Sequence, residues 1–290
     1  LSYSADGQIS QQINTIVGVS YTTQWGYDSV GRRISLIYPG GFTLSYQYDV
    51  KGRVASVVGN LGGTFATLID SVLYQPALDR RYAWRFGNGL AQGEVLDTDL
   101  RNTLLYTQNV QSRSIGYQSN GLISGITDNL NSALSGSFTY DSQDRLSQVA
   151  SSADALTIIL DSVGNRTAQT RAGASSSYAI HPSSNRMQSM SGGVSRSFLY
   201  DAVGNLQSES GTWGNRSYSY DGFNRLSGLT IGGSQVGSYL NNALNQRSYK
   251  SAAGSVTRFV YDMDGTLLAE IGPNATNYLR LGGQLVAMTR

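Results

Sequence analysis

The stretch Tyr200-Asp201-Ala202-Val203-Gly204-Asn205-Leu206 determines how the rest of the chain is interpreted. It returns about twenty residues later as Tyr220-Asp221-Gly222-Phe223-Asn224-Arg225-Leu226. A signature that recurs at a nearly fixed period indicates that one small structural unit has been copied along the chain. The sequence therefore predicts a repeat protein.

Copies of the signature extend over nearly the whole chain. Tyr-Asp pairs begin at positions 27, 48, 140, 200, 220 and 261, and Leu160-Asp161-Ser162-Val163-Gly164-Asn165-Arg166 keeps everything except the tyrosine. The spacing is about 20 residues after position 140 and roughly 20–26 residues before it, where the repeats are longer and more degenerate. Because one register runs from end to end, we expect a single array over residues 1–290, with about 11 repeats.

Each copy predicts a β-hairpin. Aromatic residues alternate before the turn, as at Phe198 and Tyr200, which indicates a strand that carries them on one face. The Asp carboxylate can accept from backbone N–H groups in the turn, and the glycine can adopt the left-handed conformation that closes it. The residues that define this structural repeat are Tyr27, Asp28, Gly31, Tyr48, Asp49, Gly52, Tyr140, Asp141, Asp161, Gly164, Tyr200, Asp201, Gly204, Tyr220, Asp221, Tyr261, Asp262 and Gly265.

Apolar residues after the turn do not alternate strictly. Leu146 and Val149 are three positions apart, and so are Leu226 and Leu229. Strict alternation would place the members of each pair on opposite faces of the sheet. Either a β-bulge or a strand buried on both faces accounts for this spacing.

The composition agrees with an all-β protein. The chain has 34 Gly, 19 Tyr, 4 Pro and no Cys, and its net charge is only +2. Tyr suits half-buried strands, whereas Gly suits tight turns. The scattered basic residues disfavour nucleic-acid binding, and no apolar run reaches the roughly 18 residues of a membrane span. Since the chain begins at Leu1 without a signal peptide, we expect it to be a piece or a processed product of something longer.

The Tyr-Asp-x-x-Gly-[Arg/Asn]-[Leu/Arg] signature resembles that of the RHS or YD-repeat family over essentially the whole chain. That family includes bacterial Rhs toxins, the C subunits of Tc toxins and the teneurin ectodomains. Two other stretches, at Asn88-Gly89-Leu90 and at residues 278–285, also look like parts of bacterial Rhs cores. The resemblance implies a long coiled β-sheet of tandem hairpins that forms part or all of a hollow shell.

In the bacterial members, the shell encloses a C-terminal toxin, which an aspartate-dependent self-cleavage motif releases. No such motif occurs before Arg290, so no catalytic residue is carried over to this chain. The resemblance implies a protein that is secreted or delivered by a bacterial system such as type VI secretion, with extracellular or cell-surface location. Its expected partners are a C-terminal toxin cargo and other shell segments.

The recurring aspartates and tyrosines are the main candidates for chemistry. Paired carboxylates at a suitable separation catalyse glycoside hydrolysis. These aspartates, however, occupy equivalent turn positions, so we interpret them as turn caps. The tyrosines predict cross-strand packing, with a sugar-binding or peptide-binding surface as the alternative. His181 is the only histidine and reads as a turn variant, and Asp262-Met263-Asp264-Gly265 lacks the further ligands of a calcium loop. We therefore expect no metal site and no cofactor.

The leading hypothesis is a non-enzymatic structural shell segment of an RHS-repeat toxin, which encapsulates or presents a cargo. The alternative is an extracellular binding or adhesion module for carbohydrate or protein. Exposed edge strands of a repeat array pair readily with other copies, so such a module could self-associate into filaments.

Overall fold

The computed structural model describes residues 1–61, 63–76 and 78–289 of the chain. Within these residues the protein consists of twenty-eight strands and one short 3-10 helix, η1 (Ser132–Leu134), and it contains no α-helix. The all-β fold of tandem hairpins expected from the sequence is therefore confirmed.

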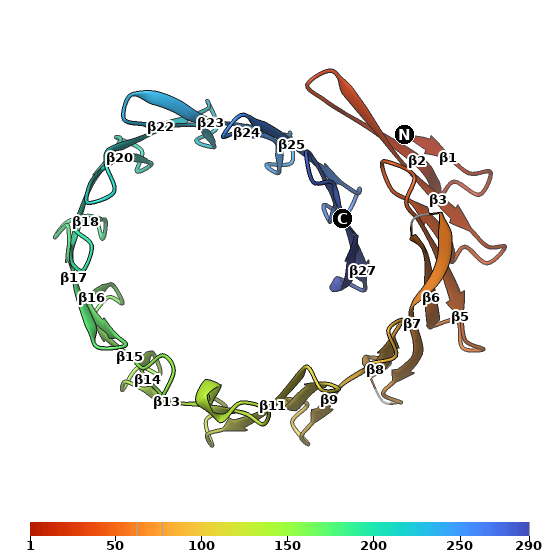
Figure 1. Cartoon of the computed structure of the whole chain (residues 1–290), viewed down its shortest axis with the longest axis horizontal. Coiled ribbons are helices and arrows are strands. Elements are labelled where there is room, and N and C mark those ends of the chain that lie inside the picture. Colours follow the sequence, from red (N-terminus) through yellow and green to blue (C-terminus); the bar gives the residue numbers. More distant parts are fainter. Residues whose placement is uncertain (62, 77, 290) are drawn as a thin grey trace. The chain divides into compact units, whose positions relative to one another are not determined.

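The strands follow one another at short intervals in the order drawn in Figure 1. The first nine are β1 (Ser2–Tyr3), β2 (Ile9–Ile16), β3 (Val19–Tyr27), β4 (Arg33–Ile37), β5 (Thr43–Tyr48), β6 (Val54–Leu61), β7 (Thr64–Tyr74), β8 (Arg81–Phe86) and β9 (Ala91–Leu96). The next eleven are β10 (Asn102–Thr107), β11 (Gln111–Tyr117), β12 (Ile123–Asp128), β13 (Gly136–Tyr140), β14 (Leu146–Ser151), β15 (Leu156–Leu160), β16 (Arg166–Arg171), β17 (Ala174–Ile180), β18 (Met187–Gly192), β19 (Arg196–Tyr200) and β20 (Leu206–Gly211). The last eight are β21 (Arg216–Tyr220), β22 (Leu226–Ile231), β23 (Ser234–Asn241), β24 (Arg247–Ala252), β25 (Ser255–Tyr261), β26 (Leu267–Ile271), β27 (Thr276–Leu281) and β28 (Gln284–Thr289).

Neighbouring strands pair in sequence order, and all of the pairs are antiparallel. Each strand pairs with the next one from β1 to β8, from β9 to β21 and from β23 to β28. Tight turns connect antiparallel neighbours, so the described strands need no crossover helices.

The chain divides into two compact units. Unit 1 comprises the described residues of Leu1–Ala91, Tyr220–Leu229 and Gln235–Arg290, and unit 2 comprises Gln92–Ser219 and Thr230–Ser234. Every buried apolar side chain of the described residues belongs to unit 1. The two units are therefore stabilised in different ways.

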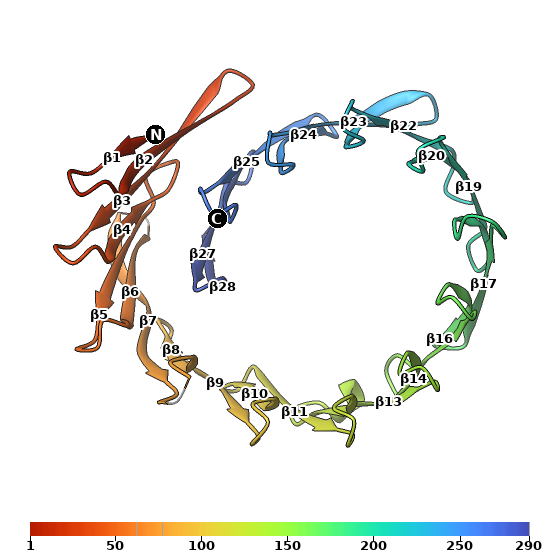
Figure 2. The ribbon, with the colours of Figure 1, turned by 180° about the vertical axis from the view of Figure 1, so that it is seen from behind.

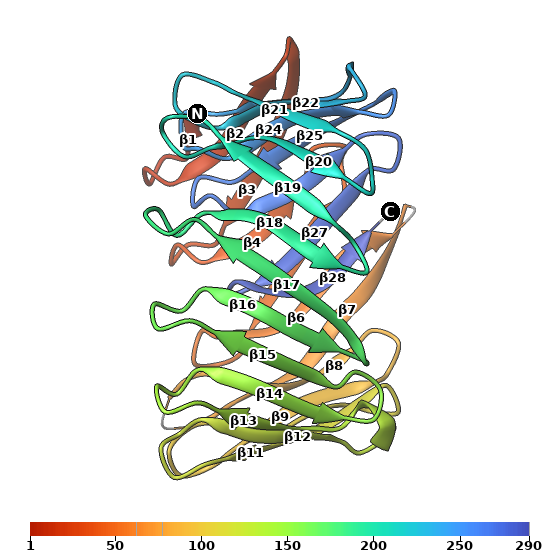
Figure 3. The ribbon, with the colours of Figure 1, turned by 90° about the vertical axis from the view of Figure 1, so that its left-hand side faces the viewer.

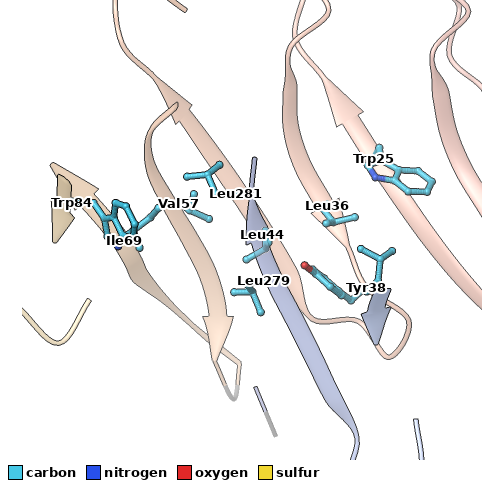
Figure 4. Packing of buried hydrophobic residues seen from close by; sticks show 10 residues of the cluster. Trp25, Leu36, Tyr38, Leu44, Val57, Ile69, Trp84, Leu279 and Leu281 are labelled. Carbon is cyan, nitrogen blue, oxygen red and sulfur yellow. The ribbon is translucent and has the colours of Figure 1, made fainter. Parts of the chain in front are cut away.

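Unit 1 has a two-layered core, in which residues far apart in the sequence lie side by side. Leu279 and Leu281 of β27 pack against a cluster from β3 to β8 (Figure 4). The hydroxyl of Tyr38 donates a 2.9 Å hydrogen bond to the backbone carbonyl of Tyr278, and Arg81 donates to the carbonyl of Leu281. The views from opposite sides in Figures 1 and 2 both place β27 beside the first strands of the chain. Members of the cluster on the N-terminal strands are Trp25, Leu36, Tyr38, Leu44, Val57, Ile69 and Trp84.

The two layers of unit 1 use opposite faces of the repeat. In the N-terminal strands the buried side chains lie on the face that carries the signature tyrosines, which we call the tyrosine face, because Leu44 alternates in step with Tyr46 and Tyr48. In the C-terminal strands Val260 is fully buried and lies next to Tyr261, so it points away from the tyrosine face. The C-terminal layer thus packs its other face onto the tyrosine face of the N-terminal layer.

Unit 2 is a single layer of hairpins. Figure 3 shows the strands from β13 to β19 as successive antiparallel hairpins. In β13, β15, β19 and β21, half-buried and exposed residues alternate, with the half-buried ones on the tyrosine face. On the other face Ile159 and Leu199 are exposed to solvent. With no second layer to bury a core, this unit depends on contacts between neighbouring hairpins.

Candidate functional site

The signature aspartate organises the turn of each hairpin. In the copy at Asp141, one carboxylate oxygen, Oδ1, accepts from the backbone N–H groups of Gln143 (2.9 Å) and Arg145 (3.0 Å). The other oxygen, Oδ2, accepts from the Arg145 guanidinium at 2.7 Å. Both oxygens of the carboxylate are therefore occupied within its own turn.

The same arrangement recurs in copy after copy. The residue four positions after the aspartate supplies the side-chain donor to Oδ2, and it is either Arg or Asn. The pairs are Asp28 with Arg32, Asp49 with Arg53, Asp97 with Arg101, Asp161 with Asn165, Asp201 with Asn205 and Asp221 with Arg225. Asn242 caps its turn in the same way, since its Oδ1 accepts from the N–H groups of Leu244 and Gln246.

The position three residues after the aspartate closes the turn in the left-handed conformation. Gly204 has a φ of 99° there. In two copies without glycine, Asp144 and Asn224 both take a φ of 60° at the equivalent position. Asn and Asp tolerate this region better than most residues, so the turn survives the loss of its glycine.

These hydrogen bonds set the acidity of the aspartates. The backbone N–H of Arg53 and then its guanidinium hold the pKa of Asp49 below its usual value. Arg101 and Arg145 lower the pKa of Asp97 and Asp141 in the same way. A general acid or base needs a pKa near the working pH, whereas these groups stay ionised and engaged.

Asp262 is the exception among the signature aspartates. Burial raises its pKa, and the backbone N–H of Thr266 offsets only part of this effect. Its turn is intact, because Oδ1 accepts from the N–H groups of Asp264 and Thr266 at 3.0 and 2.8 Å. Thr266 occupies the position that holds Arg or Asn in the other copies.

The signature tyrosine joins each hairpin to the one before it. The hydroxyl of Tyr140 donates a 2.8 Å hydrogen bond to the carbonyl of Ile123, which is the residue paired with Tyr117 of the preceding copy. Equivalent bonds of 2.6–3.0 Å link Tyr27 to Ile9, Tyr48 to Arg33, Tyr74 to Val54, Tyr117 to Asn102, Tyr200 to Met187 and Tyr261 to Arg247. The polar end of each of these side chains is thus used inside the array.

The turn arginines add a second link between neighbouring hairpins. The guanidinium of Arg53 lies 4.4 Å from the ring centre of Tyr74, and Arg101 lies 4.5 Å from Tyr117. A cation over an aromatic face is attracted by the ring's quadrupole. Arg145 instead donates to the carbonyl of Asp161 in the next turn, at 3.0 Å. These three turns are therefore connected to the following repeat.

A β-bulge follows the signature turn, as the copy at Tyr140 shows. Tyr140 pairs with Leu146 and Thr139 pairs with Gln148, so Ser147 is an extra residue without a partner in the ladder. The Ser147 hydroxyl donates to the carbonyl of Thr139 at 3.1 Å. The extra residue explains the spacing of Leu146 and Val149, and it decides between the two explanations left open by the sequence.

The remaining candidates do not form a catalytic or metal-binding constellation. Among the described residues, no three His, Cys, Asp or Glu side chains are placed to hold a metal ion. The Nδ1 of His181 accepts from the backbone N–H of Ser183 at 3.2 Å, as an aspartate does in the other turns. The described residues also include no helix that could cross a lipid bilayer.

Sequence reasoning missed a buried carboxylate in unit 2. Glu209 is only 4 % exposed and pairs with Arg196 and with Arg216, whose Nη1 lies 2.9 Å from Oε1. Tyr218 donates to the same oxygen at 2.9 Å, and Arg196 also lies over the ring of Trp213. Buried charges require such partners, so the group is fully engaged in linking neighbouring hairpins. Its residues lie outside the signature, and no spacing rule singles them out.

The chain was compared with families of known proteins and with solved structures. A sequence profile described as "RHS Repeat" matches residues 27–64. The chain is similar to a chain in the Photorhabdus luminescens Tc holotoxin pore structure, with a TM-score of 0.71 and 16 % identity, over 91 % of this chain and 16 % of that one. It also resembles the crystal structure of TcdB2-TccC3 without the hypervariable C-terminal region, with a TM-score of 0.63 and 15 % identity, over 98 % of this chain and 18 % of that one. No curated protein matches the chain in a sequence search.

These similarities show the fold. The 290 residues span less than a fifth of the solved chains that they match. The shared architecture is the one that the repeat signature led us to expect, namely tandem antiparallel hairpins in a long sheet.

Proposed function

We propose that this chain, a member of the RHS/YD-repeat family, is a non-enzymatic wall segment of an RHS-type toxin shell. The observation that carries the proposal is the internal use of the signature groups: the aspartates cap turns and the tyrosines bond to neighbouring hairpins. Such groups build a continuous wall and leave no convergent constellation for catalysis. Similarity to the Tc toxin structures supports the wall architecture.

All of the signature residues have a structural role in the repeat. Residues 1–290 form one array, and the division into two compact units reflects the second layer in unit 1 rather than a change of repeat. No residue of the signature is assigned a catalytic, cofactor-binding or metal-binding role.

The proposed partner is a toxin cargo, enclosed or presented by a shell to which this segment contributes. A protein of this kind is secreted or delivered outside the producing bacterium. Because the chain covers only 16–18 % of the matched structures, further shell segments complete the enclosure.

Protease protection of the full natural polypeptide that contains residues 1–290 tests the proposal. The polypeptide is treated with a nonspecific protease before and after the shell is unfolded with urea. We expect a folded domain outside the repeat array to resist cleavage only while the array is intact. Equal cleavage under both conditions, or a polypeptide with no sequence outside the array, would overturn the enclosure.

An extracellular binding or adhesion array is the second candidate. Large apolar side chains at the turn tips favour it, because Val50, Val203 and Phe223 are among the most exposed apolar residues of the chain. A glycan array and light scattering separate this candidate from the wall segment. Specific glycan binding or concentration-dependent filaments would favour adhesion, whereas neither is expected of a wall segment.

A further inference from the structure

Asp262 has a carboxylate oxygen that its own turn leaves unused. In the other copies Oδ2 accepts from the Arg or Asn side chain four residues later, as Asp201 does from Asn205 at 2.9 Å. Asp262 has Thr266 at that position, and no described residue donates a hydrogen bond to its Oδ2.

Asp262 lines a cavity of about 420 Å³ within unit 1. Strand β2 contributes Gln12 and Asn14 to its wall, while strand β25 contributes Phe259 and Tyr261. The Asn14 side chain donates to the carbonyl of Tyr261 at 3.3 Å, and this hydrogen bond connects β2 with β25. Among the described residues that line the cavity there is no lysine or arginine, and Asp262 is the only charged one.

Gln12, a lining residue of the same cavity, has an acceptor that its neighbours leave unused. Its side chain is more than nine-tenths buried, with an exposed fraction of 9 %. Its Nε2 donates to the Oδ1 of Asn14 at 3.1 Å, but its Oε1 has no hydrogen-bond partner among the described residues. This oxygen is enclosed by protein atoms, so an occupant of the cavity meets the Asp262 carboxylate rather than Gln12.

The charge of the lining favours a positively charged occupant. Burial raises the pKa of Asp262, and the positive charge of Arg33, which is not a lining residue, offsets this only in part. A bound cation would restore the ionised carboxylate, because an opposite charge nearby favours the charged form.

We propose that this cavity binds an organic monocation, an alkylammonium or alkylguanidinium group, with Asp262 as its counter-ion. The cavity volume accommodates one such group and its alkyl stem. The group belongs either to a free small amine or to a Lys or Arg side chain on an extended peptide. This inference does not depend on the proposed wall function.

Calorimetric or NMR titration of the 290-residue chain tests the proposal. The probes are n-butylammonium and ethylguanidinium, with n-butanol and ethylurea as uncharged counterparts of similar shape. We expect saturable binding of at least one cation and at least about tenfold weaker binding of its uncharged counterpart. A peptide with one central arginine, compared with the same peptide carrying citrulline, distinguishes a side chain from a free amine as the source.

Two variants locate the site. Thr266→Arg restores the usual donor of the signature, so it should supply the guanidinium internally and reduce cation binding at least about tenfold while keeping the fold. Asp262→Asn removes the charge but keeps the turn acceptor, and it should weaken binding to a similar degree. Asp201→Asn, the same substitution in a turn of unit 2, is the matched control and should leave binding unchanged. The proposal is wrong if no cation binds, if charged and uncharged probes bind equally, or if Thr266→Arg binds as tightly as the natural chain.

Discussion

The hydroxyl of Tyr140 lies 2.8 Å from the backbone carbonyl of Ile123 and connects two successive hairpins of a single-layered sheet. Ile123 follows the turn of the preceding repeat and is paired with Tyr117. Each such tyrosine is therefore hydrogen-bonded to a backbone carbonyl just after the turn of the preceding repeat. This relationship makes the register of one hairpin depend on its neighbour.

Tyr140→Phe is expected to loosen this junction. The substitution removes only the hydroxyl and leaves the Ile123 carbonyl without that donor, which costs about 0.5–1.5 kcal/mol. Hydrogen exchange should accelerate in β12 to β14 and remain unchanged in unit 1. Tyr178→Phe is the control, because the Tyr178 hydroxyl donates to no described residue, and equal effects of the two substitutions would contradict the assigned role.

Asp201→Ala and Asp201→Asn should differ in their effects on stability. Alanine removes the acceptor for the N–H groups of Val203 and Asn205, whereas asparagine retains an oxygen at the Oδ1 position. The chain itself contains the tolerated form, since Asn242 caps its turn through the same two bonds. Urea unfolding should therefore show a clear loss for Asp201→Ala and little change for Asp201→Asn. A result in which asparagine destabilises as much as alanine would show that charge, rather than capping, is essential.

Stability should fall at acidic pH through the turn aspartates. Hydrogen bonds from Arg53, Arg101 and Arg145 lower the pKa of Asp49, Asp97 and Asp141 in the folded state, so the folded protein binds fewer protons than the unfolded chain. The stabilisation is present above the unfolded value, near 3.8, and is lost as the pH falls through the folded values. Urea midpoints measured from pH 6 down to pH 2 should decrease mainly below about pH 4. A midpoint that rises over that interval would contradict the assignment.

The contribution of Asp262 to the pH dependence of stability should have the opposite sign. Burial raises its pKa, so the folded state favours the protonated form, and its contribution to stability decreases as the pH rises from the unfolded value through the folded one. Asp262→Asn removes this titration and should flatten the corresponding part of the profile. The comparison uses the same urea midpoints, and an unchanged profile between pH 3 and 6 would argue against a desolvated carboxylate.

Leu279→Ala should open the two-layered core of unit 1. Leu279 is fully buried between the C-terminal and N-terminal layers, and truncation of such a side chain costs about 2–5 kcal/mol. Leu199→Ala is the control, because Leu199 is 64 % exposed and should change stability by less than about 0.5 kcal/mol. Hydrogen exchange in β4 to β6 should accelerate for Leu279→Ala alone. Protection that persists in these strands would mean that the layers are held without this contact.

Much of the local structure could be predicted from the sequence. The spacing of Tyr200, Asp201 and Gly204 reports short-range geometry, because the cap, the left-handed residue and the alternating strand all lie within a few positions of each other. The three-residue spacing of apolar residues after the turn is compatible with a β-bulge or with a strand buried on both faces. The spacing alone does not show which residue has no partner in the other strand. The pairing of Tyr140 with Leu146 resolves it.

The second layer of unit 1 could not be predicted in this way. Tyr38 and Tyr278 are hydrogen-bonded although 240 positions separate them, and periodicity carries no information about which repeats stack face to face. One signal was present in the sequence: Leu279 and Leu281 place large apolar side chains at alternating positions of one strand. Thr266 in place of Arg or Asn was visible as well, but the cavity beside Asp262 depends on the tertiary packing of β2 against β25.

A cryo-electron microscopy reconstruction of the full natural polypeptide tests the central claim most directly. We expect residues 1–290 to form part of a continuous wall of hairpins, with density for another part of the polypeptide on the enclosed side. A reconstruction in which both faces of the array are open to solvent, with every other domain outside it, would contradict the claim.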